Sequence, residues 1–338
     1  MSGSDGAVLA LSGGIGGAKL ALGLSRVMRP ERLIIIANTG DDFEHLGLAI
    51  SPDLDTLMYT LADLSDPERG WGRRDETWTF MAALAALGGE TWFQLGDGDL
   101  ATHIERTRRL AAGESLSHIT DDLCRRLGIA ARILPMSEDR VRTRARTPEG
   151  WLDFQDYFVG RRCAPEVNEL AYDGAAQARP NPAFIAALAD ARLRAVVVCP
   201  SNPYLSVDPI LALPGVREAL KACRAPVIAV SPIIGGRAVK GPTAKMMREL
   251  GLPVNAAAVA QHYDGLLDLF VVDNSESEIS LPNMRIAKAA ILMTTLADRE
   301  ALAKAVLAFA DELRSARADS LSPEGRGHRP PVGGRSYD

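Results

Sequence analysis

The segment AVLALSGGIGGAKLALGLSRVM, residues 7–28, contains an apolar run, a glycine-rich turn and a longer apolar run in that order. Ala7 to Leu11 has the length of a strand, and Ala18 to Met28 has the length and apolar content of a helix. Next comes Leu33 to Ala37, a run without polar residues, as expected of a strand whose two faces are both covered. One β-α-β unit of this kind predicts a parallel sheet.

The same alternation of short and long apolar segments recurs along the chain. It predicts further strands at Trp92 to Leu95, Ala195 to Cys199, Val227 to Ser231 and Leu269 to Val272. It predicts further helices at Leu100 to Ala112, Leu116 to Leu127, Pro209 to Cys223, Pro242 to Leu250 and Asp298 to Arg314. The expected fold class is therefore α/β, with a Rossmann-like three-layer core around a mostly parallel sheet.

One region departs from this pattern. Residues 140–147 and 151–159 alternate polar and apolar side chains around the turn Pro148-Glu149-Gly150, which predicts an antiparallel hairpin inserted into the core, within an insertion of about residues 136–180. We expect one domain over residues 1–314. Residues 315–338 are rich in Arg, Gly, Pro and Ser and hold few aliphatic side chains, which predicts a disordered tail.

Composition bounds the class of protein. The 338 residues are 47% hydrophobic and 24% charged, as in ordinary globular chains. The net charge of −5 argues against nucleic acid as a partner, and the apolar runs fall far short of the roughly 20 residues that span a membrane. The N-terminus shows no export signal, so the cytoplasm is the expected location. The four cysteines are widely spaced and predict no metal cluster or disulfide framework.

The glycine-rich turn is the first candidate binding element. Gly13, Gly14, Gly16 and Gly17 leave the backbone open to an oxygen-rich ligand at a helix N-terminus, and Lys19 follows. The natural ligand is phosphate. A Walker loop is excluded because Leu20 follows the lysine, and the dinucleotide fingerprint started at Gly14 fails because position 19 is not glycine. Packing alone is the alternative explanation.

Acidic residues follow the second strand. Asn38-Thr-Gly-Asp-Asp-Phe-Glu-His45 and Ser51-Pro-Asp-Leu-Asp-Thr56 place Asp42, Asp53 and Asp55 beside the glycine-rich turn, because carboxyl ends of parallel strands share one edge. Carboxylates beside a phosphate site call for a cation, and Mg²⁺ is the hard ion that takes carboxylate and phosphate oxygens. The alternative is helix capping by Ser51 or Asp53.

Three more polar segments follow expected strands. They are Gly96-Asp97-Gly98-Asp99, Pro200-Ser201-Asn202-Pro203, and Ser231-Pro232-Ile233-Ile234-Gly235-Gly236. Segments that follow strands in this way belong to the ligand-binding edge of an α/β sheet. Their serine, asparagine and glycine content suits a nucleotide.

Together these motifs resemble the 2-phospho-L-lactate transferase family, which builds the deazaflavin coenzyme F-420. The resemblance extends from Leu11 to about Phe309, in seven collinear blocks: LSGGIGGAK (11–19), NTGDDFEHLGLAISPDLDT (38–56), GWGRRDETW (70–78), LGDGDLATHI (95–104), LPMSEDRVRT (134–143), PSNPYLS (200–206) and SPIIGGRAVKGP (231–242). It implies a Mg²⁺-dependent enzyme, usually a homodimer, that transfers a phospho-acyl group from its guanosine diphosphate ester to the ribityl hydroxyl of the deazaflavin Fo and releases GMP. In bacterial members the transferred group is phosphoenolpyruvate.

The resemblance also implies roles for residues. Asp42 and Asp55 would be catalytic, and Asp42, Asp53 and Asp55 would hold Mg²⁺ or orient Fo. The implied nucleotide-binding and Fo-binding residues are Gly13, Gly14, Gly16, Gly17, Lys19, Asn38, Asp53, Trp71, Asp97, Ser201, Asn202, Ser231 and Gly235. For Trp71, ordinary packing with Trp78 is the alternative.

One position departs from the family pattern. The family usually carries arginine where this chain has Gly98. If that arginine contacts Fo, then another arginine such as Arg73 or Arg74 replaces it here, or Fo binds less tightly. A second explanation for the glycine is a positive φ at position 98. Phospholactate, phosphoenolpyruvate and phosphoglycerate all stay open as the transferred acid.

Two other functions compete with the transferase. A non-enzymatic regulator of the same fold that binds nucleotide sugars would lack the block from Ser51 to Thr56, which is intact here. An NAD-dependent oxidoreductase rests on β-α-β organisation alone, because the fingerprint fails.

Overall fold

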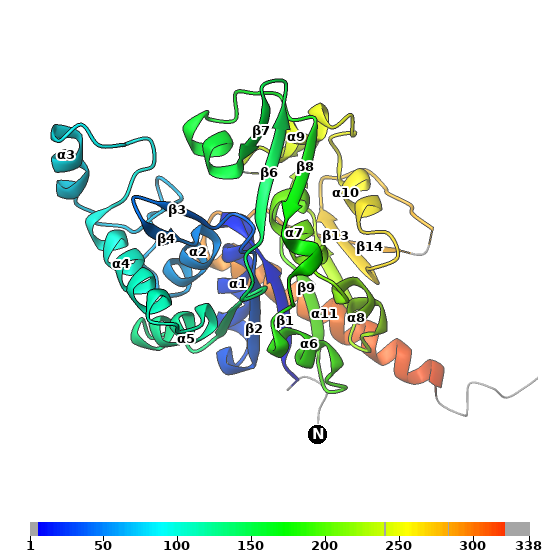
Figure 1. The fold of residues 1–338 in the computed structure, drawn as a ribbon. Coiled ribbons are helices and arrows are strands. Elements are labelled where there is room, and N and C mark those ends of the chain that lie inside the picture. The colour runs from blue at the N-terminus through cyan, green and yellow to red at the C-terminus, as the bar shows by residue number, and fades with distance from the viewer. Residues whose placement is uncertain (1–5, 240, 283, 322–338) are drawn as a thin grey trace, which may run out of the picture.

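A seven-stranded sheet forms the centre of the molecule, in the order β14-β13-β10-β9-β1-β2-β5, and every pair of neighbouring strands is parallel (Figure 1). The computed structural model describes residues 6–239, 241–282 and 284–321. The strands are β1 (Val8–Ser12), β2 (Leu33–Ala37), β5 (Arg132–Pro135), β9 (Ala195–Val198), β10 (Val227–Val230), β13 (Leu269–Asp273) and β14 (Arg285–Ala289). The predicted α/β class is confirmed, while β5 and β14 were not predicted.

Helices cover both faces of the sheet, because successive side chains of each buried strand point in opposite directions. Val8 and Ala10 pack with α1 (Gly14–Val27), α2 (Pro52–Leu61) and α11 (Leu296–Leu321). Leu9 and Leu11 pack on the opposite side, with α6 (Pro182–Ala189), α7 (Asp208–Leu211), α8 (Val216–Ala222) and α10 (Ala256–His262). The predicted three-layer core is thus confirmed.

The predicted hairpin is the first part of a three-stranded antiparallel sheet, which rises above the carboxyl ends of the main sheet (Figure 1). Its strands are β6 (Arg142–Thr147), β7 (Gly150–Asp153) and β8 (Glu169–Asp173). The second arm is shorter than predicted, since Asp156–Gly160 forms a π-helical turn. That turn buries Tyr157 against Ala145 and Met246, a contact that a continued strand would break.

A side lobe, defined as residues 43–50 and 63–111, lies at the left in Figure 1. It consists of β3 (Phe43–His45), β4 (Leu48–Ile50), α3 (Thr79–Ala86) and α4 (Asp97–Ala111), and α5 (Leu116–Arg126) follows. The strand expected at residues 92–95 is absent. Trp92 and Phe93 instead pack on His45 and Phe43, so this apolar run completes the small core of the side lobe.

Two further expected helices are present, one of them divided. The helix expected over residues 209–223 is divided into α7 and α8, because Gly215 has a φ of +78°. The helix expected at residues 242–250 is α9 (Thr243–Glu249), and two short strands precede it, β11 (Ile233–Ile234) and β12 (Arg237–Ala238).

The last helix, α11, continues to Leu321, so the tail predicted to begin at residue 315 is helical at its start. Arg317 explains why: its guanidinium pairs with Asp268 and donates to the Arg224 carbonyl at 3.0 Å. The rest of the predicted tail, 322–338, lies outside the described residues. Within the described chain, no helix is both long and apolar enough to cross a membrane.

Candidate functional site

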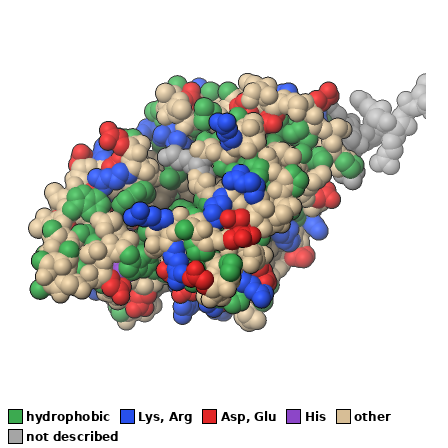
Figure 2. Space-filling model, turned by 90° about the horizontal axis from the view of Figure 1, so that it is seen from above, with side chains coloured by type: hydrophobic (Ala, Val, Ile, Leu, Met, Phe, Trp, Pro, Cys, Tyr) green, Lys and Arg blue, Asp and Glu red, His purple; other side chains and the backbone are tan. Residues whose placement is uncertain are grey.

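The segments that follow β1, β2, β9 and β10 meet above the sheet. The N-terminus lies at the bottom of Figure 1, so the carboxyl ends of the strands point toward the top. Figure 2 looks down on this face and shows many Lys and Arg side chains spread over it. Such an edge is where α/β proteins bind ligands.

Asp53 organises the glycine-rich turn. The Gly14 amide donates a hydrogen bond to Asp53 Oδ1 at 2.6 Å, and Asn38 Nδ2 donates to Asp53 Oδ2 at 2.9 Å. Burial raises the pKa of Asp53 to about 6, although both hydrogen bonds favour the ionised form. The carboxylate therefore lies at the N-terminus of α1, where the helix dipole stabilises negative charge.

Most of the glycines permit close packing. A Cβ at Gly16 would collide with the Pro200 carbonyl, and one at Gly17 would collide with the hydroxyls of Ser12 and Ser201. Gly14 differs, because its φ is +64° and a Cβ there would meet open space. Glycine is therefore needed in this turn for two reasons. Gly16 and Gly17 allow close contact with the loop after β9, and Gly14 adopts a left-handed backbone conformation next to open space.

Three residues predicted to bind nucleotide make hydrogen bonds to the protein backbone. Asn202 accepts hydrogen bonds from the amides of Tyr204 and Leu205, at 3.0 and 3.2 Å. The Ser231 hydroxyl accepts from the Ile233 amide at 3.1 Å and donates to the carbonyl of the same residue at 2.9 Å. Ser201 similarly accepts from the Gly13 amide at 3.1 Å.

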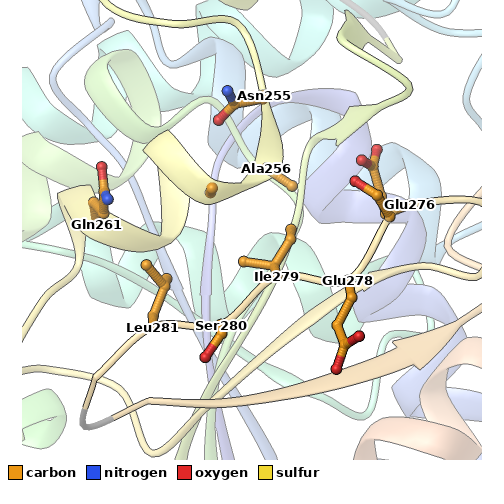
Figure 3. Close-up of a pocket in the computed structure, with 10 residues that line it drawn as sticks. Asn255, Ala256, Gln261, Glu276, Glu278, Ile279, Ser280 and Leu281 are labelled. Carbon is orange, nitrogen blue, oxygen red and sulfur yellow. The ribbon is translucent and has the colours of Figure 1, made fainter.

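Lys19 and Gly235 are also engaged within the protein. Lys19 Nζ donates to the Met293 carbonyl at 2.7 Å. The Gly235 amide donates to Glu276 at 2.6 Å, beside a pocket of about 370 Å³. Figure 3 shows this pocket between α10 and the loop after β13, lined among others by Asn255, Ala256, Gln261, Glu276, Glu278, Ile279, Ser280 and Leu281. The charged residues of its lining are Glu276 and Glu278.

The acidic segment after β2 holds polar atoms that the fold does not satisfy. Ser51 occupies the N-cap position of α2, but its hydroxyl donates to Asp42 Oδ2 at 2.8 Å and makes no capping hydrogen bond. Among the described residues, Asp41 Oδ1, Asp42 Oδ1 and Thr39 Oγ1 are buried without a hydrogen-bond partner. Burial raises the pKa of Asp42 to about 7. Burial also raises the pKa of Asp41 well above its usual value, and the negative charge of the nearby Asp53 raises it further.

Asp42 and Thr39 line a pocket of about 320 Å³ between the loop after β2, the start of α5 and the segment after β5. Phe43, Ile50, Leu110 and Leu116 supply apolar wall, and Ser51, Ser137 and Arg142 supply polar groups. Buried carboxylate oxygens that lack partners, together with hydroxyls, are the hard ligands that Mg²⁺ requires. Within this pocket, Asp42 Oδ1 and the Thr39 hydroxyl are the unpartnered oxygen atoms that could hold the ion.

Asp55 lies in a different environment. The Arg106 guanidinium pairs with both of its oxygens, with Nη1 at 3.1 Å from Oδ2. Asp55, Asp99 and His103 are the one acidic-histidine group in the described chain whose ligand atoms lie within 4.8 Å of one another. Burial alone would raise the pKa of Asp99, but the interactions with His103 and Tyr59 outweigh it. The pKa of Asp99 therefore lies below its usual value. Since Arg106 already neutralises Asp55, this cluster is a buried ion network joining α2 to α4.

Trp71 and Asp97 belong to the side lobe. Asp97 accepts hydrogen bonds from the Thr77 hydroxyl at 2.6 Å and the Phe80 amide at 3.0 Å, which lowers its pKa and secures the start of α3. Trp71 is 44% exposed and packs edge-to-face on Trp78. The structure thus brings Asp42 and Asp53 to the sheet edge and leaves these two residues on the lobe.

Gly98 lies in the first turn of α4, and its φ is not positive, so the explanation from a positive φ is wrong. Its amide donates to Glu76 at 2.7 Å, and Arg73 Nη1 donates to its carbonyl at 3.2 Å. A guanidinium is therefore present beside position 98, supplied by Arg73 from the preceding loop.

Asp41, Thr39, Arg106 and Arg142 were missed by sequence reasoning. Asp41 could have been found, since it adjoins Asp42 in the same Asp-Asp pair. Thr39 and Arg142 lie in quoted blocks, 38–56 and 134–143, but nothing in those blocks distinguishes them from their neighbours. They and Arg106 are recognised only from the residues they meet in space.

The chain matches known proteins along most of its length. Residues 8–311 match the family model described as 2-phospho-L-lactate transferase CofD. It is 41% identical to the phosphoenolpyruvate transferase of Streptomyces griseus, over 91% of this chain and 99% of that protein. It is 38% identical to the phosphoenolpyruvate transferase of Mycobacterium tuberculosis, over 90% of this chain and 98% of that protein.

Two crystal structures of a UPF0052-family protein from Bacillus halodurans share the fold. At 15% and 14% identity they superpose with TM-scores of 0.53 and 0.58, covering 82% and 90% of this chain and 83% and 99% of those chains. The family model and the relatives, together with the parallel sheet and its carboxylate-rich edge, lead to one conclusion. The chain belongs to the 2-phospho-L-lactate transferase CofD family.

Proposed function

We propose that this protein transfers a phospho-acyl group from its guanosine diphosphate ester to the ribityl hydroxyl of Fo, forming a phosphodiester and releasing GMP. The observation that carries the proposal is the pair of buried carboxylates with unpartnered oxygens, Asp41 and Asp42, beside the turn that Asp53 organises. A diphosphate ester brings negative charge to this edge, and phosphoryl transfer depends mainly on positioning and charge neutralisation.

Asp42, with Asp41 next to it, would hold Mg²⁺. When bound, this ion neutralises charge on the diphosphate oxygens. Asp53 contributes by fixing the Gly14 amide and Asn38, so that the turn keeps its shape when the nucleotide binds. We place the guanosine diphosphate over the loops after β1, β9 and β10, where Gly14 faces open space.

The hydroxyl of Fo loses its proton as its oxygen forms the new bond to phosphorus and the bond from phosphorus to the GMP oxygen breaks. Asp55 is a poor acceptor for that proton, because Arg106 holds both of its oxygens. Asp41, which adjoins the carboxylate assigned to the ion and whose pKa burial raises, supplies the better base. We therefore propose that Asp55 positions α4, that Asp41 is the base and that Asp42 holds the ion.

Among the three candidate acids we propose phosphoenolpyruvate as the transferred group. The relatives from Streptomyces griseus and Mycobacterium tuberculosis are both named phosphoenolpyruvate transferase. Phospholactate differs from it only by reduction of one double bond, so a pocket that takes one admits the other at some rate.

The direct test is product formation. The protein is incubated with Fo, Mg²⁺ and each guanosine diphosphate ester of the three acids in turn, and the products are identified by mass spectrometry. We expect a phosphodiester of Fo and equimolar GMP, formed fastest from the phosphoenolpyruvate ester. Binding of nucleotide without any product would favour the regulator of the same fold.

We also propose a homodimer located in the cytoplasm. One feature supports self-association: α3 is apolar after Thr79, yet Ala82, Ala83, Ala85 and Ala86 are exposed on it. Sedimentation equilibrium tests the assembly, and a monomer at micromolar concentration would overturn it.

A further inference from the structure

The pocket beside Asp42 contains more acidic than basic residues, yet its other acids already have hydrogen-bond or ion-pair partners within the protein. Glu138 accepts hydrogen bonds from the amides of Leu116 and Ser117, at 2.9 and 3.1 Å, at the start of α5. Asp139 pairs with Arg179, and Glu114 pairs with Arg109. Asp42 differs from them: burial raises its pKa although the positive charges of Arg142 and Arg106 act to lower it, and its Oδ1 has no hydrogen-bond partner among the described residues. It is the residue we assign to Mg²⁺.

Arg142 lines the same pocket with unused hydrogen-bonding capacity. Its side chain is half-buried, and within the described residues the hydrogen bond it makes is from Nη1 to the Val141 carbonyl at 2.7 Å. Two positions along β6, Arg144 pairs instead with Asp153 and Asp173. A half-buried guanidinium that keeps most of its donors free is suited to an anion from outside the protein.

The transferred group supplies such an anion. Phospholactate, phosphoenolpyruvate and phosphoglycerate all carry a carboxylate next to the carbon that bears the phosphate. When that phosphate lies at the Asp42 site, the carboxylate must lie close by. It would repel the acidic segment unless a cation faces it.

We propose that Arg142 binds the carboxylate of the transferred three-carbon acid, with the unpartnered Thr39 hydroxyl completing the subsite. Planar guanidinium groups bind carboxylates through two parallel hydrogen bonds, which gives both affinity and orientation. The inference rests on the proposed function, and it names the residue that distinguishes an acid ester from plain GDP. Lys19, the lysine of the glycine-rich turn, is directed to Met293 instead.

Calorimetry with three probes tests the assignment: the guanosine diphosphate ester of L-lactate, the matching ester of lactamide, and GDP. All are titrated in the presence of Mg²⁺ but without Fo, so no transfer occurs. Wild type should bind the lactate ester at least about tenfold more tightly than the lactamide ester, the effect expected of a well-formed charge-assisted hydrogen bond. Arg142→Gln should abolish that preference and change GDP affinity less than about twofold.

Two further variants control for general charge. Arg140 lines the same pocket but is exposed, so Arg140→Gln should keep the preference for the lactate ester. Arg142→Lys should restore only part of it, because lysine cannot form the two parallel bonds. Circular dichroism and a thermal melt of each variant verify folding.

The outcomes separate the two proposals. If wild type forms product while Arg142→Gln retains the preference for lactate over lactamide, this inference is wrong and the proposed function stands. The same holds if Arg140→Gln loses as much preference as Arg142→Gln, since general charge would then explain both. If wild type binds neither ester more tightly than GDP and forms no product from any of them, the proposed function itself fails.

Discussion

The carboxylates at the sheet edge and those of the side lobe differ in how completely the fold satisfies them. Asp41 and Asp42 are buried and each keeps an oxygen without a hydrogen-bond partner among the described residues. Asp97 accepts hydrogen bonds from Thr77 and from the start of α3 instead. A buried polar group without a partner costs stability, so a fold retains one where a ligand will satisfy it. The acid of the lobe holds structure, whereas the unpartnered oxygens of the edge are the ones we propose for a cation.

Replacing Asp42 should produce the largest effect on activity. Asp42→Asn removes a metal-ligand charge at nearly constant volume, and we expect kcat to fall by roughly 10³-fold, as when a metal-dependent step loses its ion. The melting temperature without divalent cations should stay equal or rise, because burial disfavours the ionised form of Asp42. GMP release and differential scanning calorimetry measure the two quantities.

The matched control for this change is Asp97→Asn in the side lobe. It should lower the melting temperature by a few degrees and leave the KM for the guanosine ester unchanged. A large loss of activity in the lobe variant with none in Asp42→Asn would reverse the comparison.

Arg106 offers the largest expected effect on stability. Arg106→Met leaves the buried Asp55 carboxylate unpaired, and breaking a buried pair in this way costs about 3–5 kcal/mol. Urea unfolding gives the difference, and the double variant Arg106→Met with Asp55→Leu should recover much of it. If Arg106→Met kept full stability but lost Mg²⁺-dependent turnover, Asp55 would belong to the edge site after all.

The glycine-rich turn allows a comparison between two glycines that are two positions apart. Gly16→Ala would place a methyl group against the Pro200 carbonyl, and such overpacking costs about 1–3 kcal/mol. Gly14→Ala meets open space but must adopt a φ of +64°, which costs about 1–2 kcal/mol. We expect GDP affinity, measured by calorimetry, to fall more in Gly14→Val than in Gly14→Ala, since the longer side chain reaches into the nucleotide space. Equal affinity in both would limit the turn to packing.

The end of α11 should give the smallest effect. Truncation after Arg314 removes Arg317 and its contacts to Asp268 and the Arg224 carbonyl. Because this pair is partly exposed, we expect the melting temperature to drop by about 2–4 °C and activity to stay the same. An unchanged melt would mean that this last part of the helix adds nothing to the fold.

The buried strands and the large helices could be predicted from the sequence. Leu33 to Ala37 is a strand at its predicted limits, because a short run of aliphatic residues has one stable arrangement in a layered core. β14 escaped prediction since Arg285 and Lys288 interrupt its apolar pattern at the sheet edge. Trp92 to Leu95 has the pattern of a strand, yet it packs against the β3–β4 hairpin, and local pattern cannot report that choice.

For the site, residue type and order along the chain were enough to predict the family and to bring Asp42 and Asp53 to one edge of the sheet. The phosphate and the cation at that edge stay predictions. Residue type and order could not assign partners. Asp53 and Asp55 are two residues apart, yet one binds the Gly14 amide and the other pairs with Arg106, 51 residues further along the chain. Side chains two positions apart on a helix point in different directions, so their neighbours depend on which elements pack on each side. The role of each carboxylate thus follows from long-range packing, which brings together segments that no sequence window contains.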